Sequence, residues 1–246
     1  MSHLSYAAAT VPVRGDFAAA HNRFWKRLAA PGAWWSGAER VAIAAEVRQA
    51  RSCALCQTRK NALTPAAVQG EHDHLGVLPE AAVDVIHRVV TDQNRLSRQW
   101  FDSIMAAGLS AEQYVEMIGT VVAMVSIDSF CRGIDVPLNP LPKPQPGEPS
   151  HYRPPGAAPE QAWVPMILAE RATGAEADLY GGKPTGNVIR AMSLVPDEVR
   201  TLQDLSAVHY LPSGQVRNPT ASAGTLSRMQ MELIAGRVSA LQQCFY

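Results

Sequence analysis

The sequence predicts an all-α fold, and three observations carry that prediction. Capping boxes, in which a serine is followed three residues later by Glu or Gln, stand at Ser36, Ser110 and Ser227. Apolar residues at helical spacing follow each box, which is typical of a helix that buries one side. No stretch alternates apolar and polar residues, so we expect no convincing strand.

A shortened copy of one early unit closes the chain. The copy aligns with the first unit without a gap. The aligned identical residues include Cys53 with Cys244, Ser36 with Ser227, Ile43 with Ile234 and Val47 with Val238. Several residues therefore set the register of the repeat. A period of about 190 residues indicates duplicated units and not a solenoid.

The expected helices follow from caps, breakers and apolar spacing. They are Asp16 to Ala30, Ser36 through the cysteines to about Leu63, Leu78 to about Val90, Ser97 to Ala107, Ala111 to about Cys131, Asn187 to Leu194, Pro196 to Val208, and the repeated helix after Ser227. Half of the prolines lie in 137–159, which predicts an extended linker or a surface strap. We therefore divide the chain into a first unit at 1–136, a linker at 137–162 and a second, incomplete unit at 163–246.

Composition excludes several function classes. The 246 residues carry 22 basic and 22 acidic side chains, so we expect neither a nucleic acid nor a membrane as partner. We also expect no bilayer-spanning segment and no signal peptide, which makes a cytoplasmic location the default. In that reducing compartment the C-x-x-C pair, Cys53 and Cys56, indicates redox or metal chemistry before a structural disulfide.

The end of the chain carries a family resemblance. The segment 226–246, LSRMQMELIAGRVSALQQCFY, resembles the signature helix of the alkylhydroperoxidase D-like, carboxymuconolactone decarboxylase-like superfamily. The segment 187–191, NVIRA, is similar to the helix that precedes it in peroxidase-related members. The resemblance implies tandem all-helical units, a homo-oligomer and a thiol peroxidase reaction.

The resemblance also implies roles for individual residues. In this family the second cysteine attacks the peroxide and the first resolves the product, while a glutamate twelve residues before the first cysteine and a histidine four residues after the second relay protons. The second unit matches at Glu232 and Cys244 and stops before the attacking position. The first unit has Cys56 as nucleophile and Cys53 as resolving thiol. Val41 and Lys60 occupy its glutamate and histidine positions, so Glu46 and His87 are the candidates for proton transfer.

We therefore expect a thiol-dependent hydroperoxide reductase or dithiol/disulfide oxidoreductase, an antioxidant enzyme of the alkylhydroperoxidase type. Its partners would be a small-molecule peroxide and a dithiol or thioredoxin-like reductant, with no cofactor and no metal ion. One alternative is a structural zinc site made by Cys53 and Cys56 with His72 and His74. The others are a non-catalytic helical scaffold and a cofactor-free decarboxylase-like enzyme.

Two hypotheses concern the last helix. Because the chain stops inside a motif, position 247 is a candidate selenocysteine, which would complete the motif after Tyr246. The same stop leaves the apolar face of the helix without its usual neighbours. We expect either a neighbouring subunit or the first unit to cover that face.

Overall fold

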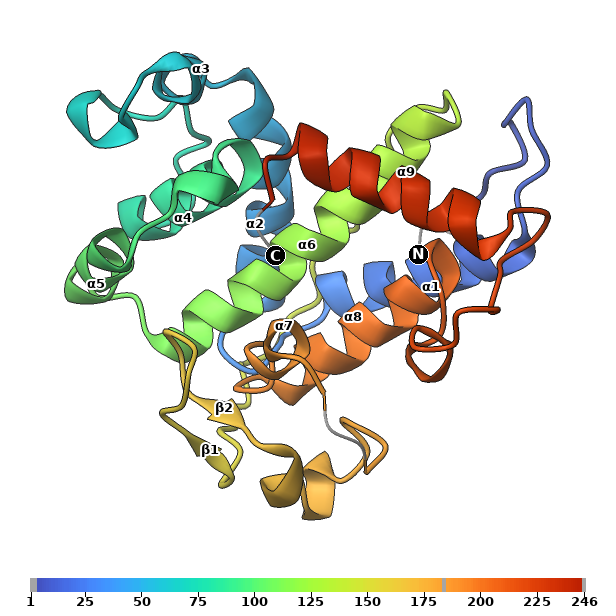
Figure 1. The fold of residues 1–246 in the computed structure, drawn as a ribbon. Helices are drawn as coiled ribbons and strands as arrows, with labels where there is room; N and C mark the ends of the chain where they lie inside the picture. Colours follow the sequence, from blue (N-terminus) through green and yellow to red (C-terminus); the bar gives the residue numbers. More distant parts are fainter. Residues whose placement is uncertain (1–3, 183–184, 245–246) are drawn as a thin grey trace.

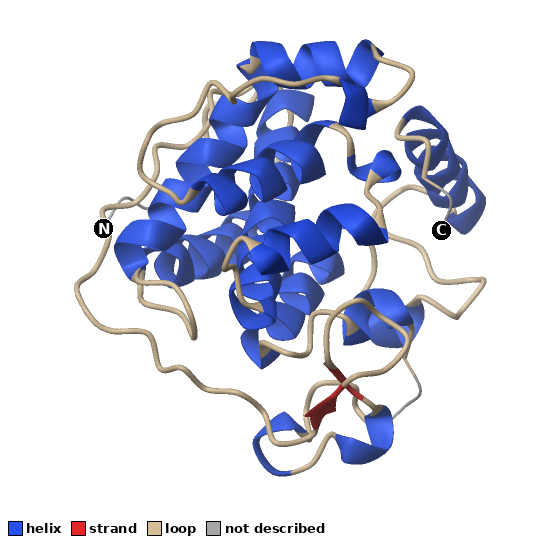
Figure 2. Ribbon diagram, turned by 90° about the vertical axis from the view of Figure 1, so that its left-hand side faces the viewer, coloured by secondary structure: helices blue, strands red, loops and turns tan. Residues whose placement is uncertain are grey.

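The computed structural model describes residues 4–182 and 185–244, and it is mostly helical (Figures 1 and 2). The helices are α1 (Gly15–Ala29), α2 (Gly37–Gln49), α3 (Ala54–Asn61), α4 (Glu80–Thr91), α5 (Arg98–Ala106), α6 (Ala111–Gly133), α7 (Asn187–Arg190), α8 (Pro196–His209) and α9 (Arg228–Leu241). The prediction of an all-α fold is confirmed at this level. Short 3-10 turns, including Ala50–Ser52 between α2 and α3, connect several of the helices.

The long helix α6 forms the centre of the molecule, and α1, α2, α4 and α8 pack around it (Figure 1). By length and composition alone α6 could cross a membrane, which the sequence analysis did not anticipate. Most of its apolar surface is buried against the surrounding helices, as expected for the core helix of a helical bundle. This core holds α2 and α4 side by side, and those two helices carry much of the candidate site.

The three predicted capping boxes are confirmed. The hydroxyls of Ser36, Ser110 and Ser227 each accept a hydrogen bond from the backbone amide three residues on. In each box the Glu or Gln side chain at that third position accepts from the serine amide in return. The starts of α2, α6 and α9 are therefore determined by local sequence.

The proline-rich segment is a strap along the surface of the helices, in extended conformation (Figure 2). The Gln145 amide donates to the Ala29 carbonyl at 2.7 Å, and the Trp25 indole donates to the Pro140 carbonyl at 2.9 Å. Because prolines cannot donate, the strap is held mainly by donors from the helices and its own few amides.

Contrary to the expectation of no strand, a short antiparallel ladder follows the strap. Strand β1 (Ala157–Ala158) pairs with β2 (Met166–Ile167). Two residues per strand are too few to produce a visible alternating pattern, so the sequence offered no signal for this pairing.

Helix α8 belongs to the predicted second unit but packs against α1 and α6 of the first. Its Leu205 lies in the same apolar cluster as Leu28 of α1 and Val121 of α6. This packing joins the predicted first and second units in one apolar core. The division of the chain at 137–162 therefore stays a prediction.

Helix α9 presents most of its apolar side chains to solvent. The exposed ones are Met229, Leu233, Ile234, Val238 and Leu241, and Met231 packs inward against Leu211 and Ala221. Near the end of the helix, Gln242 and Gln243 bond to Gln93 and Asn94 in the turn after α4. The expectation that the first unit covers this apolar face is therefore wrong for the described residues, and coverage by a neighbouring subunit stays a prediction.

The contact between α1 and α8 contains two stacked histidines, His21, which is buried, and His209, which is half-buried. The Tyr6 hydroxyl donates to His21 Nδ1 at 2.5 Å, and His21 Nε2 lies 2.8 Å from His209 Nε2. Burial, with a smaller contribution from His209, lowers the pKa of His21 to about 4, and burial also lowers the pKa of His209. Both rings are therefore neutral in the folded protein near neutral pH.

We expect His21 to reduce stability as the pH falls. Between the unfolded pKa of about 6.5 and the folded value of about 4, the unfolded chain takes up a proton that the folded protein does not. This difference in proton uptake lowers the free energy of unfolding by at most about 3 kcal/mol, and the effect is absent above pH 6.5. Urea unfolding between pH 8 and pH 4 measures this effect. The free energy of unfolding of His21→Asn, which keeps an acceptor for Tyr6, should rise relative to that of the wild type as the pH falls. His74→Asn, at an exposed histidine, should not; equal profiles for the two variants would contradict the assignment.

Candidate functional site

We predicted one continuous helix through the C-x-x-C segment, and this prediction is wrong. The segment lies at a break between α2 and α3. Helix α2 ends at Gln49, a 3-10 turn follows, and Cys53 takes an extended conformation with ψ of 121°. Cys53 is the N-cap of α3, and Cys56 lies in its first turn. Both sulfurs are thus buried beside the amide end of α3.

Two neighbouring helices bring a histidine and a glutamate to Cys56. His87 Nδ1, from α4, lies 3.3 Å from Cys56 Sγ, and His87 Nε2 lies 2.8 Å from Glu46 Oε1 of α2. Glu46 and His87 are both buried, with 1% and 0% of their surfaces exposed. The candidates named for proton transfer therefore form a continuous chain from carboxylate to imidazole to thiol.

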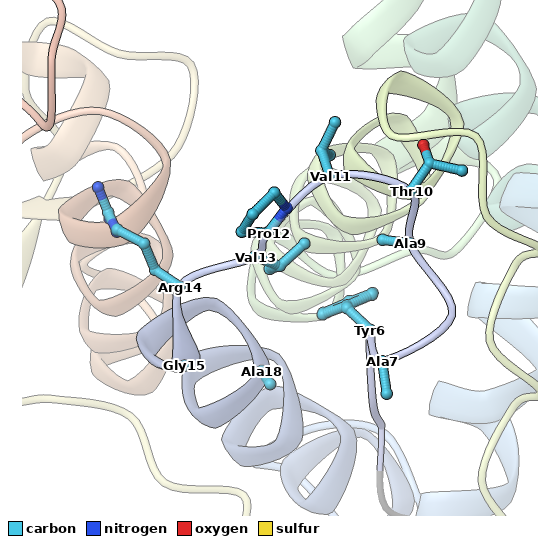
Figure 3. Close-up of a pocket in the computed structure, with 10 residues that line it drawn as sticks. All are labelled: Tyr6, Ala7, Ala9, Thr10, Val11, Pro12, Val13, Arg14, Gly15 and Ala18. Atoms are coloured by element: carbon cyan, nitrogen blue, oxygen red, sulfur yellow. The ribbon is translucent and has the colours of Figure 1, made fainter.

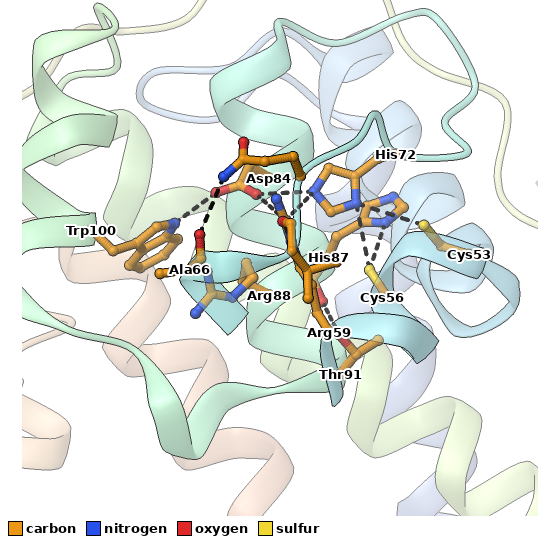
Figure 4. A network of polar contacts seen from close by, with 12 residues as sticks. Cys53, Cys56, Arg59, Ala66, His72, Asp84, His87, Arg88, Thr91 and Trp100 are labelled. Atoms are coloured by element: carbon orange, nitrogen blue, oxygen red, sulfur yellow. Dashed lines mark hydrogen bonds and ion pairs between the residues drawn. The ribbon is translucent and has the colours of Figure 1, made fainter. Parts of the chain in front are cut away.

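A second histidine approaches the sulfurs from the loop between α3 and α4. His72 Nδ1 lies 3.6 Å from Cys53 Sγ and 3.5 Å from Cys56 Sγ. Figure 4 shows His72 and His87 side by side above the two cysteines. The opposite nitrogen of His72 contacts Asp84 at 2.9 Å, so this ring too is oriented by a carboxylate.

Polar contacts hold that loop and the two carboxylates in place. The Asp73 side chain accepts from the Ala54 amide at 2.7 Å, and the Asp73 amide donates to Cys53 Sγ at 3.4 Å. The Leu75 amide donates to the second oxygen of Glu46 at 3.1 Å. The loop is therefore attached both to the start of α3 and to the carboxylate behind His87.

The environment gives the two histidines different charges. Burial works against a charge on His72, but hydrogen bonds to Asp84 and to both thiols raise its pKa to about 10. Burial lowers the pKa of His87, and the Glu46 contact offsets this only in part. Near neutral pH we therefore assign His72 as imidazolium and His87 as neutral imidazole, with Nε2–H on Glu46 and Nδ1 accepting from Cys56.

The positive charge on His72 lies between two groups that are favoured in their negatively charged forms, Asp84 and Cys53. Burial works against ionisation of Asp84, but hydrogen bonds from His72 and from the Trp100 indole lower its pKa to about 2. Burial likewise opposes a thiolate at Cys53, yet hydrogen bonds from the Cys56 amide and from His72 lower the Cys53 pKa overall. The site is therefore arranged to hold negative charge on sulfur.

The second copy of the motif is not assembled in the same way. Glu232 of α9 is exposed and accepts from Tyr210 and from Arg228, and these bonds lower its pKa. Cys244 lies beyond the end of α9 and is also exposed. The remaining motif residues, Phe245 and Tyr246, and the selenocysteine hypothesis for position 247 lie outside the described residues. The structure thus brings Cys53, Cys56, Glu46 and His87 together and leaves Glu232 and Cys244 apart from them.

Of the two histidines named for the alternative zinc site, only one lies at the cysteines. His72 joins the two cysteines, but His74 is exposed and its Nδ1 accepts from the Gly76 amide. His87 takes the place that the sequence analysis assigned to His74. The sequence analysis also missed Asp84, although its position three residues before His87 puts both on one face of α4.

Two cavities in the described part of the chain contain none of these residues. The N-terminal loop and the start of α1 line an open hollow of about 400 Å³, whose wall is mostly Ala, Val and Pro (Figure 3). A more enclosed, largely apolar cavity of about 300 Å³ lies between α6 and α8, with Glu198 at its wall. The cysteines and their histidine and carboxylate partners therefore lie outside these two cavities.

Comparison of the chain with protein-family models, with curated proteins and with solved structures finds no match. The class of protein is defined by what the fold and the site contain, which is a helical bundle with a buried dithiol between two carboxylate-bound histidines. Membership of the alkylhydroperoxidase D-like superfamily stays a prediction.

Proposed function

We propose that the protein is a thiol-dependent hydroperoxide reductase, with Cys56 as nucleophile and Cys53 as resolving thiol. The observation that carries the proposal is the chain from Glu46 Oε1 through His87 to Cys56 Sγ, with contacts of 2.8 Å and 3.3 Å. A neutral imidazole aligned by a carboxylate is the arrangement that removes a proton from a nucleophile.

The reaction follows in two steps. His87 Nδ1 takes the Cys56 proton, and the thiolate attacks the outer oxygen of the hydroperoxide. An S–O bond forms, the O–O bond breaks, and the alcohol leaves with the proton from His87. Cys53 then attacks the Cys56 sulfenic acid, so that an S–S bond forms and water leaves. Two thiols are oxidised for each peroxide reduced, and an external dithiol or thioredoxin-like protein restores them.

The position of each sulfur supports these roles. Cys56 is the thiol that contacts His87, whereas Cys53 contacts His72 and the Asp73 amide, which favour its thiolate. The two sulfurs lie within 4.8 Å of each other, so disulfide formation needs only a small rearrangement. Because both are buried, a peroxide reaches Cys56 only after part of the surrounding structure moves.

We also propose that the chain is built from tandem alkylhydroperoxidase D-like units. The gapless repeat and the matching capping boxes of α2 and α9 support a duplication. The retained cysteine pair of the first unit and the altered proton-transfer positions would then make it a divergent copy. A neighbouring subunit would cover the exposed apolar face of α9.

Stoichiometric oxidation tests the proposed function. Reduced protein treated with one equivalent of hydroperoxide should form one intramolecular disulfide between Cys53 and Cys56, identified by peptide mass spectrometry, with one equivalent of peroxide consumed. A dithiol should then restore both thiols. Reaction no faster than that of a simple thiol, or oxidation spread over all four cysteines, would instead support a non-catalytic helical scaffold.

A further inference from the structure

The four inward-facing atoms of the site have the spacing of a metal-binding tetrahedron. Cys53 Sγ, Cys56 Sγ, His72 Nδ1 and His87 Nδ1 all lie within 4.8 Å of one another. Zinc bonds of about 2.3 Å to sulfur and about 2.0 Å to nitrogen, at tetrahedral angles, place S and N atoms about 3.5 Å apart. The three S to N distances given above are 3.6, 3.5 and 3.3 Å. We propose that the reduced protein binds one Zn²⁺ through these four atoms.

The surroundings of the histidines support this site independently. His72 and His87 direct the same nitrogen, Nδ1, at the sulfurs, and each holds a carboxylate at Nε2, Asp84 and Glu46 respectively. Metal-ligating histidines carry such a partner on the far nitrogen, which fixes the tautomer and makes the near nitrogen a better ligand. Asp84 is itself held by the Trp100 indole at 2.6 Å and by Arg59 at 3.1 Å.

The charges and the ligand types favour zinc in this buried position. Two thiolates neutralise a divalent cation, so the loaded centre adds no net charge to the interior. Two thiolates and two imidazoles in a tetrahedron form a set typical of zinc. On binding, metal–sulfur bonds replace the S–H bonds that are present, and His72, an imidazolium in the metal-free protein, gives up its Nδ1 proton; these protons pass to solvent. Four protein ligands leave no position for water, which indicates a closed site.

Zinc and peroxide would compete for the same sulfurs. With both sulfurs bound to zinc, neither can attack the peroxide, and with the disulfide formed neither can bind zinc. This consequence rests on the proposed function, whereas zinc binding itself does not. Zinc would then have to leave the sulfurs before the pair is oxidised, so added Zn²⁺ should slow disulfide formation.

Metal titration tests the site without any peroxide. The full chain, reduced and stripped by a chelator under anaerobic conditions, should take up one Co²⁺. It should develop the sulfur-to-cobalt charge-transfer band and the intense d–d bands of tetrahedral Co²⁺, which one equivalent of Zn²⁺ abolishes. Cys53→Ser and His72→Ala should lose this spectrum, and Asp84→Asn should weaken binding by about 10- to 100-fold. The matched control His74→Ala, two residues from His72 and exposed, should bind as the wild type does.

Several results would overturn the proposal. These are no tetrahedral Co²⁺ spectrum in the wild type, retention of the spectrum in Cys53→Ser, or equal losses in His72→Ala and His74→Ala. If the variants fail to fold by circular dichroism, X-ray absorption at the zinc edge of the wild type decides, because it must show two sulfur and two nitrogen neighbours. Zinc binding without peroxide-driven disulfide formation would refute only the proposed function, and the converse result would refute only the zinc site.

Discussion

Replacing Cys56 with serine is expected to abolish dithiol-driven hydroperoxide consumption. A serine hydroxyl does not ionise near neutral pH, so the chain from Glu46 through His87 would end at a group that cannot attack a peroxide. The loss should reach the level of the uncatalysed reaction. Steady-state consumption of a hydroperoxide in the presence of a dithiol measures it.

Cys53→Ser should behave differently from Cys56→Ser. It retains the attacking thiol, so one equivalent of peroxide should still react and leave a Cys56 sulfenic acid, which a dimedone-type reagent traps. Turnover with the dithiol should fall because no internal thiol resolves that acid. Equal behaviour of the two variants would remove the assignment of separate roles.

A third cysteine variant distinguishes the two copies of the motif. The sequence analysis named Cys244 as a candidate catalytic residue, but it lies beyond α9 in an exposed position, apart from the chain formed by Glu46, His87 and Cys56. Cys244→Ser should therefore keep wild-type turnover. A loss comparable with that of Cys56→Ser would place the reaction in the second unit, contrary to the proposal.

The two related helices show how far the sequence could predict this structure. The capping boxes placed the starts of α2 and α9 correctly, because a cap is decided by residues three apart in the chain. Burial depends on what packs nearby, and here the copies differ. Ile43 of α2 is fully buried against α6, whereas its counterpart Ile234 in α9 is 54% exposed.

The candidate site was only partly predictable for a related reason. The C-x-x-C pair is local and was visible, and Glu46 and His87 were candidates by residue type. The choice of His72 over His74 depends on the path of the loop, and the contribution of Trp100 depends on α5 lying near α4. Contacts that join five separate segments, namely α2, α3, the loop after it, α4 and α5, leave no periodic signal in a single sequence.

A buried ion cluster between α2, α6 and α8 leads to the prediction with the largest effect on stability. Arg40 Nη1 lies 2.8 Å from Glu116 Oε1, and Arg40 Nη2 lies 3.8 Å from Glu198 Oε1. The side chains of all three are at most 4% exposed. Among the described residues, neither oxygen of Glu198 has a hydrogen-bond partner. Burial raises the pKa of Glu198 to about 7, and the positive charges of Arg40 and, to a smaller extent, Arg27 oppose this rise. Arg40 is the cation that contacts both Glu116 and Glu198.

Arg40→Ala should destabilise the protein by about 3–5 kcal/mol at neutral pH, because it leaves buried carboxylates without a cation. Denaturant unfolding measures this, and Arg23→Ala, which breaks an exposed pair with Asp204, should cost less than about 1 kcal/mol. Without Arg40 the folded-state pKa values of both carboxylates rise further above their unfolded values, so the folded protein binds more protons than the unfolded chain. The stability difference between wild type and Arg40→Ala should therefore grow as the pH rises from 5 to 8.

The same reasoning gives a second-site rescue. Glu198→Gln removes the charge that Arg40 balances least well, since the 3.8 Å contact is the longer of the two. In the Arg40→Ala background it should restore part of the lost stability and flatten the pH dependence, as a neutral amide needs no cation. A double variant as unstable as Arg40→Ala at pH 8 would show that lost packing of the arginine side chain, and not unpaired charge, causes the destabilisation. The cluster would then stabilise the contact between α2, α6 and α8 mainly through van der Waals packing of the arginine side chain.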